Sequence, residues 1–186
     1  MKTEIENDTL FREIEKISGE RFFTIGPVKG RLLADIVRNS GVKMVLEIGT
    51  YIGYSAILMA KALPEDGKVV TIEIDPKSVA QALCNIQKTK CINKIEIRVG
   101  DAGIVIPGIR EEFDVIFIDA DKSRYLEYLK LSEKKLKRGG IVFTDNVKVF
   151  ASDMPDFLDY VRKSGRYESR YIDMGYDGVE ISKKLF

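Results

Sequence analysis

Oxygen-bearing side chains follow two apolar stretches of the 186-residue chain. Asp119 ends the stretch "DVIFID", and Asp145 and Asn146 end the stretch "GIVFTDN". Two carboxylates and a carboxamide form a hard-ligand set, and neither stretch contains a thiol or an imidazole. Such a set favours Mg²⁺, with Mn²⁺ or Ca²⁺ as substitutes. If the two stretches are neighbouring strands, the sequence predicts a divalent-metal site.

Lys122 lies shortly after Asp119, in the first turn of a predicted helix. The positive end of the helix dipole and a nearby metal ion both disfavour an ammonium charge at this position. A lysine that gives up its proton readily can act as a general base for a hydroxyl group. Asp121 either caps this helix or pairs with Lys122 or Arg124, and pairing with Lys122 would keep the lysine charged.

The composition narrows the chemistry further. The chain has no histidine, which excludes a Ser-His-Asp triad, an imidazole base and histidine-bound zinc. Its two cysteines, Cys84 and Cys91, are too few for a disulfide framework or a zinc cluster. Proton transfer must therefore use carboxylates, lysine, tyrosine or a metal-bound water. The formal net charge of +1 gives no overall field that would attract nucleic acid.

A glycine loop, "LEIGTYIGYS", links the first predicted strand to the following helix. Gly49 and Gly53 allow a tight turn and the close approach of a ligand. Glu73 ends the next predicted strand, where an acid can accept hydrogen bonds from ribose hydroxyls. Dinucleotide binding prefers G-x-G-x-x-G, whereas this loop is G-x-x-x-G and follows Glu47, which would repel a pyrophosphate but accept from an ammonium. The pattern favours S-adenosylmethionine (SAM) over a nicotinamide dinucleotide.

Another acidic position follows the third predicted strand, in "VGDAGIVIP". Asp101 opens the next helix there, with Gly100 before it and Ala102 after it. Asp101 either caps that helix or faces the adenine of a bound nucleoside, and the sequence leaves both roles open.

Hydrophobic periodicity places these residues on an alternating series of strands and helices. Strands are predicted at 43–48, 68–74, 94–99, 114–119 and 140–145, and helices at 3–18, 28–39, 53–63, 76–88, 102–110, 122–137 and 153–164. The alternation predicts a doubly wound, Rossmann-like α/β sheet that is mostly parallel and covered by helices on both faces. A closing hairpin, 166–174 and 178–186, should add an antiparallel last strand. Gly139 and Gly140 are expected to end the helix over 122–137.

The chain is predicted to form a single domain, 1–186, without repeats or linkers. Within it we expect N-terminal helices over 1–40, a cofactor-binding core over 41–147 and a helix with the hairpin over 148–186. No apolar run approaches the ~20 residues of a membrane span. The charged N-terminus, "MKTEIENDTLFREIEKIS", is unlike a signal peptide, so the expected location is the cytoplasm.

Several motifs together resemble a known family. They are "VLEIGTYIGYSAILMAKAL", "TIEIDP", "GDA", "FIDADKSRYLEYL" and "GGIVFTDNV", in this order. They resemble the cation-dependent SAM O-methyltransferases, which include catechol O-methyltransferase, the caffeoyl-CoA O-methyltransferases and small microbial relatives. The resemblance covers about residues 22–147, and "DMGYDGVEIS" is similar to the closing hairpin of the family. It implies transfer of a methyl group from SAM to a hydroxyl of a small, catechol-like acceptor.

The resemblance also implies a role for each matching residue. Asp119, Asp145 and Asn146 fall on the metal ligands of the family, and Lys122 falls on its catalytic lysine. The segment "FTIGPVKG" is similar to the one that closes over the cofactor. The residues implied in cofactor binding are Ile25, Glu47, Gly49, Tyr51, Ser55, Glu73, Ile74, Gly100, Asp101, Ala102 and Asp119.

Other functions stay open from the sequence. Some small members of the family methylate a tRNA uridine oxygen, and the stretches "KKLKR" and "RKSGRYESR" supply positive charge. A nicotinamide-dependent oxidoreductase and a nucleoside-binding module without chemistry are alternatives of another class. The segment after Asn146 is shorter than in larger relatives, which leaves the acceptor and a homodimer open.

Overall fold

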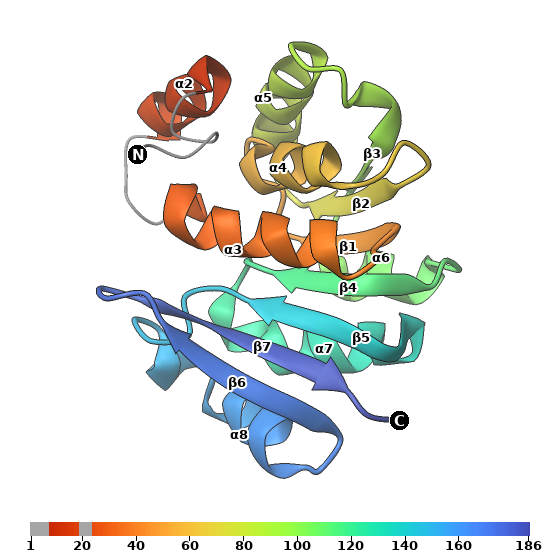
Figure 1. Cartoon of the computed structure of the whole chain (residues 1–186), viewed down its shortest axis with the longest axis vertical. Helices are drawn as coiled ribbons and strands as arrows, with labels where there is room; N and C mark the ends of the chain where they lie inside the picture. The colour runs from red at the N-terminus through yellow and green to blue at the C-terminus, as the bar shows by residue number, and fades with distance from the viewer. Residues whose placement is uncertain (1–7, 19–23) are drawn as a thin grey trace.

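A seven-stranded sheet runs through the centre of the computed structural model, which describes residues 8–18 and 24–186 (Figure 1). Its strands are β1 (Met44–Ile48), β2 (Lys68–Glu73), β3 (Ile95–Val99), β4 (Phe113–Ile118), β5 (Leu136–Thr144), β6 (Tyr167–Asp173) and β7 (Gly178–Lys184). The spatial order is β3-β2-β1-β4-β5-β7-β6. The first five strands are parallel, and β7 is antiparallel to both of its neighbours. The predicted doubly wound α/β sheet with an antiparallel C-terminal strand is confirmed.

Helices cover both faces of the sheet (Figure 1). The α-helices are α2 (Thr9–Ser18), α3 (Gly26–Asn39), α4 (Tyr54–Ala62), α5 (Pro76–Gln87), α6 (Ala102–Gly108), α7 (Tyr125–Ser132) and α8 (Pro155–Lys163). Short 3-10 helices are η1 (Ile92–Lys94), η2 (Lys122–Arg124), η3 (Glu133–Lys135) and η4 (Ala151–Asp153). One apolar cluster contains residues of α2, α3, α4 and α5 together with Val45 and Val115. The other contains residues of α6, α7 and α8 together with Leu46 and Ile116. Neighbouring strand residues face opposite sides, so both are apolar where helices cover both faces.

The strand order changes direction at β1. This strand pairs with β2 on one side and with β4 on the other. The loops that follow β1 and β4 border a crevice at the carboxyl ends of these strands. Ligands of doubly wound sheets bind in this crevice, beyond the carboxyl ends of the strands. Backbone pairing continues past the strands: Asp119 N–H donates to Ile48 O at 3.0 Å, and Asp145 N–H donates to Ile118 O at 3.2 Å. The residues after β1, β4 and β5 are therefore held side by side at one edge.

Gly49 shows how closely these loops approach each other. A Cβ atom at Gly49 would lie 2.1 Å from the Asp119 carbonyl oxygen, and the φ of this residue is +98°. Only glycine accepts both the left-handed backbone and this contact. The glycine loop therefore lets the chain leave β1 directly against the residue that follows β4.

The helix predicted over 122–137 is shorter than expected. After α7 and η3 the chain enters β5 at Leu136, so Gly139 and Gly140 lie inside a strand and do not end the helix. This part of the prediction was wrong. Leu136 is buried and pairs with Phe113 on β4. Strand pairing and burial outweigh the helix propensity of the lysine-rich segment.

The two ends of the chain follow the prediction where they are described. α2 is the described part of the expected N-terminal helix, and residues 3–7 of that helix lie outside the described residues. β6 and β7 form the expected hairpin, and its turn contains a hydrogen bond from Met174 N–H to Asp177 O of 2.9 Å. Of the described helices, none is long and apolar enough to cross a membrane.

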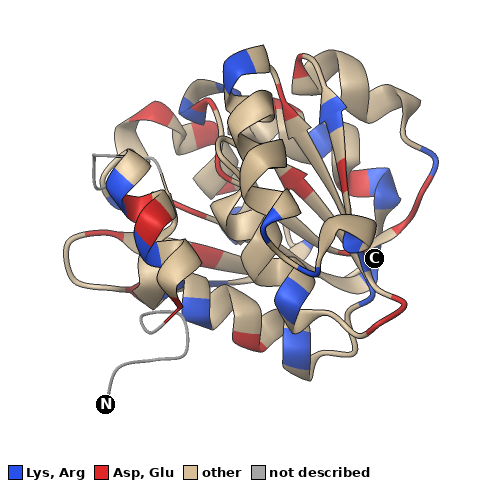
Figure 2. Cartoon of the chain, turned by 90° about the horizontal axis from the view of Figure 1, so that it is seen from above, with Lys and Arg blue, Asp and Glu red and all other residues tan. Residues whose placement is uncertain are grey.

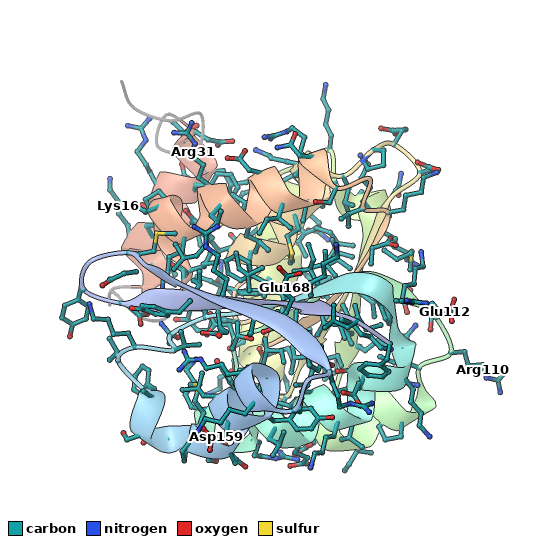
Figure 3. The ribbon with its side chains drawn as sticks, turned by 60° about the horizontal axis from the view of Figure 1, so that its bottom comes forward. Lys16, Arg31, Arg110, Glu112, Asp159 and Glu168 are labelled. Atoms are coloured by element: carbon teal, nitrogen blue, oxygen red, sulfur yellow. The ribbon has the colours of Figure 1, made fainter. Side chains whose placement is uncertain are left out.

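Charged residues of both signs are distributed around the molecule (Figure 2). Arg110, in the segment before β4, is among those whose side chains point away from the ribbon (Figure 3). The mixture of signs agrees with the formal net charge of +1. Local contacts at the crevice, and not an overall field, should therefore decide which ligand binds.

Candidate active site

A cavity of about 320 Å³ lies beyond the carboxyl ends of β1, β2, β3 and β4. Eight residues predicted for the cofactor line it: Gly49, Tyr51, Glu73, Ile74, Gly100, Asp101, Ala102 and Asp119. Asp121, Arg124 and Tyr128 form the wall on the side of α7. The fold therefore gathers the acids of several separate loops around one space.

Glu73 is held by backbone donors on both carboxylate oxygens. Tyr51 N–H donates to Oε2 at 2.7 Å, and the N–H groups of Ile74 and Asp75 donate to Oε1 at 2.9 Å each. Tyr51 has a φ of 47°, so the glycine loop turns this amide toward the acid. A carboxylate has about four lone-pair sites, so Glu73 can accept a further bond from the cavity side. This arrangement suits a ribose hydroxyl.

Glu47 lies beneath the glycine loop, outside the described wall of the cavity. It is fully buried and accepts from Ser55 Oγ and from Thr71 Oγ1, the latter at 2.5 Å. Burial raises the pKa of this carboxyl to about 8; the two hydroxyl donors oppose the rise, and the charges of Asp119 and Glu73 add to it. Glu47 and Ser55, both predicted for the cofactor, therefore support the loop from below.

A second cavity, of about 230 Å³, opens between the start of α3 and the β6–β7 turn. Its lining includes Ile25, Val28, Met174 and Tyr176, with Lys29 and Asp177 as its charged residues. Ile25, predicted for the cofactor, is therefore placed at this cavity and not in the described wall of the larger one.

Asp101 caps α6 and also pairs with Arg124. Its Oδ1 accepts from Gly103 N–H at 2.7 Å, and Arg124 donates to its two oxygens at 2.7 and 3.1 Å. The hydrogen bonds from Arg124, followed by the one from Gly103, lower the pKa of Asp101. The Arg124 guanidinium lies over the Tyr128 ring, 5.0 Å from its centroid. Asp101 thus holds the cavity wall together through Arg124, which the sequence did not assign to the cofactor site.

Asp121 caps the η2 turn before α7. Its Oδ1 accepts from Ser123 N–H at 3.1 Å and from Ser123 Oγ at 2.7 Å, so of the roles left open the structure shows capping. Lys122 instead donates to Asp119 Oδ1 at 2.7 Å. Its Nζ also lies 5.3 Å from the centroid of the Tyr125 ring and 5.8 Å from that of Phe150. Lys122 is therefore directed toward the acid that ends β4.

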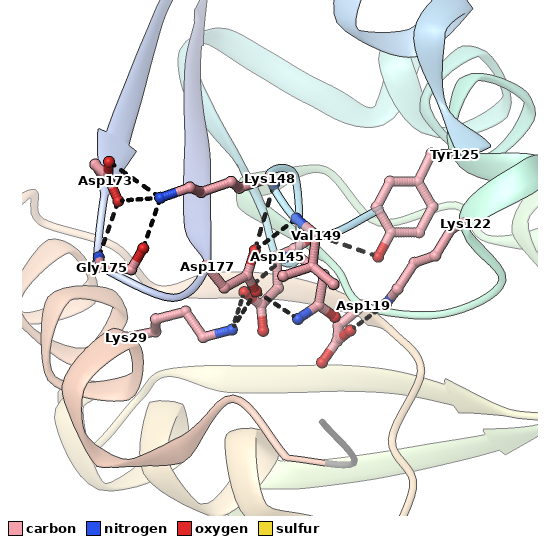
Figure 4. A network of polar contacts seen from close by, with 11 residues as sticks. Lys29, Asp119, Lys122, Tyr125, Asp145, Lys148, Val149, Asp173, Gly175 and Asp177 are labelled. Carbon is pink, nitrogen blue, oxygen red and sulfur yellow. Dashed lines mark hydrogen bonds and ion pairs between the residues drawn. The ribbon is translucent and has the colours of Figure 1, made fainter. Parts of the chain in front are cut away.

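Asp145 and Asn146 lie buried after β5, and Asp145 lies close to Asp119 (Figure 4). Asp145 forms an ion pair with Lys29, whose Nζ lies 2.6 Å from Asp145 Oδ1. Burial raises the pKa of Asp145 and the neighbouring charge of Asp119 adds to this rise, whereas Lys29 opposes it. The two carboxylates therefore interact through their charges, and a cation placed between them would relieve this repulsion.

Asn146 carries a buried oxygen that has no hydrogen-bond partner among the described residues. Its Nδ2 donates to Asp177 Oδ2 at 2.8 Å, whereas its Oδ1 accepts no hydrogen bond from any described residue. An unpaired carbonyl oxygen beside two carboxylates suits a hard cation. Asp119, Asp145 and Asn146 therefore fit the predicted Mg²⁺ site. The described residues contain no group of three or more acids, histidines or cysteines that could hold a metal. The predicted set has only two acids, and its third ligand is the amide oxygen of Asn146.

Lys29 and Asp177 belong to this cluster but were missed from the sequence. Lys29 lies in the first turn of α3 and Asp177 in the hairpin turn, far apart along the chain. Lys29 Nζ nevertheless contacts Asp145 at 2.6 Å and Asp177 at 3.0 Å. An aspartate followed by glycine in a hairpin is ordinarily a turn residue, and this local pattern conceals the tertiary contact.

Comparison with known proteins identifies the family of this site. The O-methyltransferase family matches residues 3–160. The chain belongs to this family. The resemblance drawn from the motifs is thereby confirmed, and the chain is a SAM-dependent O-methyltransferase of the catechol O-methyltransferase type. A nicotinamide-dependent oxidoreductase and a module without chemistry are set aside.

Relatives of this O-methyltransferase include two catechol O-methyltransferases. That of Niastella koreensis is 36% identical over 148 residues, which cover 76% of this chain and 67% of the relative. That of Sus scrofa is 32% identical over 174 residues, which cover 87% of this chain and 92% of the relative.

Solved O-methyltransferase structures share the fold over nearly the whole chain. The enzyme from Bacillus cereus, in complex with SAH, has a TM-score of 0.87 and 27% identity and covers 95% of this chain and 91% of that one. TomG from Streptomyces achromogenes, in complex with SAM, has a TM-score of 0.85 and 25% identity and covers 100% of this chain and 92% of that one. The similarity therefore extends beyond the sequence motifs to the arrangement of the sheet and its helices.

Proposed function

We propose that this O-methyltransferase transfers the methyl group of SAM to one of two adjacent oxygens of a small, catechol-like acceptor, with the help of a divalent metal ion. The observation that carries the proposal is the buried Oδ1 of Asn146, which has no partner among the described residues and follows Asp145, whose carboxylate lies close to Asp119 (Figure 4). Three oxygen donors leave coordination positions for acceptor oxygens and water. Mg²⁺ is the ion that this donor set favours, with Mn²⁺ or Ca²⁺ as substitutes.

SAM is proposed to occupy the cavity of about 320 Å³. The relatives from Bacillus cereus and Streptomyces achromogenes were solved with SAH and SAM. Glu73 would accept from the ribose hydroxyls, and Gly100, Asp101 and Ala102 would border the adenine. The glycine loop would approach the methionine part, next to Asp119. When bound, SAM supplies a methyl group on a positively charged sulfur.

Lys122 is the proposed general base. A bound metal ion would lower the pKa of the acceptor hydroxyl. Lys122, as the neutral amine after its ammonium proton has passed to solvent, would then accept the proton of that hydroxyl. Its Nζ lies 2.7 Å from Asp119 Oδ1 and close to the rings of Tyr125 and Phe150. These contacts direct a flexible side chain before the acceptor arrives, and such positioning favours reaction.

The acceptor is proposed to extend into the cavity of about 230 Å³ beside α3. Val28, Met174 and Tyr176 give this space apolar walls, and Lys29 and Asp177 form a charged end near Asp145. A ring with two neighbouring hydroxyls has apolar faces and one polar edge, which matches such a lining. The catechol O-methyltransferases among the relatives support an acceptor of this class.

The tRNA alternative has less support from the described residues. Several basic residues of the stretches that suggested it pair with acids of this chain: Lys137 with Asp114, Arg162 with Glu180, Lys163 with Asp159 and Arg166 with Glu133. Affinity for nucleic acid comes largely from lysine and arginine that neutralise phosphates. Basic residues that are already paired contribute less, so a small acceptor is preferred.

Methyl transfer from labelled SAM to catechols, hydroxylated CoA esters and unmodified tRNA tests this function. We expect turnover of a catechol that EDTA abolishes and added Mg²⁺ restores. Asp145→Ala should abolish the response to Mg²⁺, whereas Asp173→Ala, which removes an exposed acid of the β6–β7 hairpin, should preserve it. Turnover that persists in EDTA, or a wild-type response of Asp145→Ala, would reject the metal-dependent mechanism.

A further inference from the structure

We propose that Asp177, in the turn between β6 and β7, is a positioning residue that keeps the Asn146 oxygen directed toward the divalent cation. This role depends on the proposed metal-dependent function and adds a residue to it. Asp177 is 5% exposed, although its neighbour Tyr176 in the same turn is 67% exposed. A carboxylate buried in a hairpin turn needs donors that compensate for the loss of water.

The Asp177 carboxylate accepts from four donors (Figure 4). Oδ2 accepts from Asn146 Nδ2 at 2.8 Å and from Lys29 Nζ at 3.0 Å. Oδ1 accepts from the backbone N–H groups of Lys148 and Val149, at 3.3 and 3.2 Å. The acid therefore joins α3, the loop after β5 and the hairpin turn at one point.

Asp177 selects one of the two orientations of the Asn146 amide, because a carboxylate can only accept. The observed orientation turns Nδ2 toward Asp177 and leaves Oδ1 without a partner among the described residues. Half a turn of the amide would place its oxygen against the Asp177 carboxylate, where two acceptors repel each other. Asp177 therefore keeps the Asn146 oxygen available as a ligand, one residue from Asp145.

Lys29 explains why Asp177 does not compete for the cation. The Lys29 ammonium bridges Asp145 Oδ1 at 2.6 Å and Asp177 Oδ2 at 3.0 Å. Each oxygen of Asp177 already accepts from two donors, which occupies the lone pairs of a carboxylate. If a divalent cation bound the Asp145 carboxylate, Asp177 would remain as a partner for Lys29, so the ammonium would stay paired.

Asp177→Asn tests the role with a nearly isosteric change. The new amide can keep its oxygen on the backbone N–H groups, but its NH₂ then faces the NH₂ of Asn146 and the ammonium of Lys29. We expect the dissociation constant for Mn²⁺, measured from the EPR signal of the free ion, to rise ~10–100-fold. The dissociation constant for SAM, measured by calorimetry, should stay unchanged because Asp177 borders the other cavity.

Asp173→Asn is the matched control. Asp173 lies in the same hairpin and is exposed, and its carboxylate accepts from Lys148 Nζ at 3.1 Å and from Gly175 N–H at 2.9 Å. The change removes the same charge, and among the described residues Asp173 makes no hydrogen bond with Asn146, so we expect wild-type affinity for Mn²⁺. An equal loss in both variants would overturn the proposal, since net charge alone would then explain it.

A double-mutant cycle separates positioning of Asn146 from general support of the loop. If Asp177 acts through Asn146, Asp177→Asn should weaken Mn²⁺ binding much less in an Asn146→Ala background than in the wild type. The full loss in that background, or no loss in the single variant, would overturn the role of Asp177 and leave the metal-dependent function standing. A wild-type protein that does not bind Mn²⁺ would overturn both.

A measurement on the wild-type chain covers the case in which Asp177→Asn does not fold. The chain has five asparagines, so ¹⁵N-asparagine labelling gives few side-chain amide signals, and Asn146→Ala identifies the one from position 146. With Mg²⁺ bound, we expect this NH₂ group to exchange slowly with water because it stays buried and bonded to Asp177. Fast exchange in the Mg²⁺-bound protein would overturn the proposal.

Discussion

The two sides of the crevice hold their acids in different ways. On the cofactor side, Glu73 accepts from three backbone N–H groups, and Asp101 accepts from one backbone N–H and from an arginine. On the side of the proposed metal site, called the metal side below, Asp119 and Asp145 each accept from the ammonium of a lysine. Backbone donors are fixed by the fold, whereas a lysine ammonium sits on a flexible stem.

This difference matches the two proposed tasks, which are recognition of a neutral ribose on one side and binding of a metal ion on the other. An acid held by fixed donors keeps one orientation, which recognition of ribose hydroxyls requires. An acid neutralised by a lysine is stable without a metal ion and can still exchange its partner for a stronger cation. Asp119 belongs to both sides, since it lines the cofactor cavity and pairs with Lys122. The two sides should therefore respond separately to mutation.

Of the changes at Lys122, Glu73 and Glu47, Lys122→Ala on the metal side is expected to have the largest effect on catalysis. Loss of a general base lowers kcat by ~10²–10⁴-fold, and steady-state assays with a catechol and Mg²⁺ would measure it. The SAM dissociation constant should stay near the wild-type value, because the cofactor acids keep their backbone donors. Lys130→Ala removes an exposed lysine of α7 and serves as the control. Wild-type turnover by Lys122→Ala would exclude this lysine as the base.

A smaller effect is expected on the cofactor side, from Glu73→Gln. Hydrogen bonds to a charged group contribute about 1.5–3 kcal/mol, so the SAM dissociation constant should rise by about one to two orders of magnitude. Calorimetry measures this change, and the affinity for Mn²⁺ should not alter. Glu65→Gln, at a fully exposed position, is the matched control. Loss of Mn²⁺ affinity in Glu73→Gln would break the separation of the two sides.

The smallest effect on catalysis is expected from Glu47→Gln, beneath the glycine loop. This change should instead alter the free energy of unfolding. The pKa of Glu47 is raised from 4.5 to about 8 in the folded chain. As the pH rises through this range, the unfolded chain releases the proton and the folded chain keeps it, so ionisation favours unfolding. Glutamine cannot ionise, so the variant should gain stability relative to the wild type, by about 1.4 kcal/mol for each pH unit in this window.

Urea unfolding of both proteins at several pH values between about 5 and about 10 measures the difference in the free energy of unfolding. The difference should grow with pH in favour of the variant and level off above the folded pKa of about 8. A difference that does not change with pH would show that Glu47 is not held protonated by its burial.

Much of the fold and part of the candidate site could be predicted from local patterns. Apolar runs predict the strands, and an acid or amide at the end of a run predicts its carboxyl end. Glu73, Asp119 and Asp145 are such residues. The prediction of one helix over 122–137 was wrong at its lysine-rich end. That end has a local preference for helix, whereas Leu136 pairs with β4 and is buried there. Local preference cannot report a partner that lies elsewhere in the chain.

The sequence by itself determined the order of strands and helices and the set of acids at the strand ends, because both depend on neighbouring residues. The tertiary structure alone decided which of these acids meet, and it placed Glu47 below the loop and not in the described cavity wall. It also brought Lys29 to Asp177, 148 positions away, and Asp177 to Asn146, 31 positions away. No periodicity encodes such pairs, because they form only when the sheet carries α3, the end of β5 and the hairpin turn to one edge.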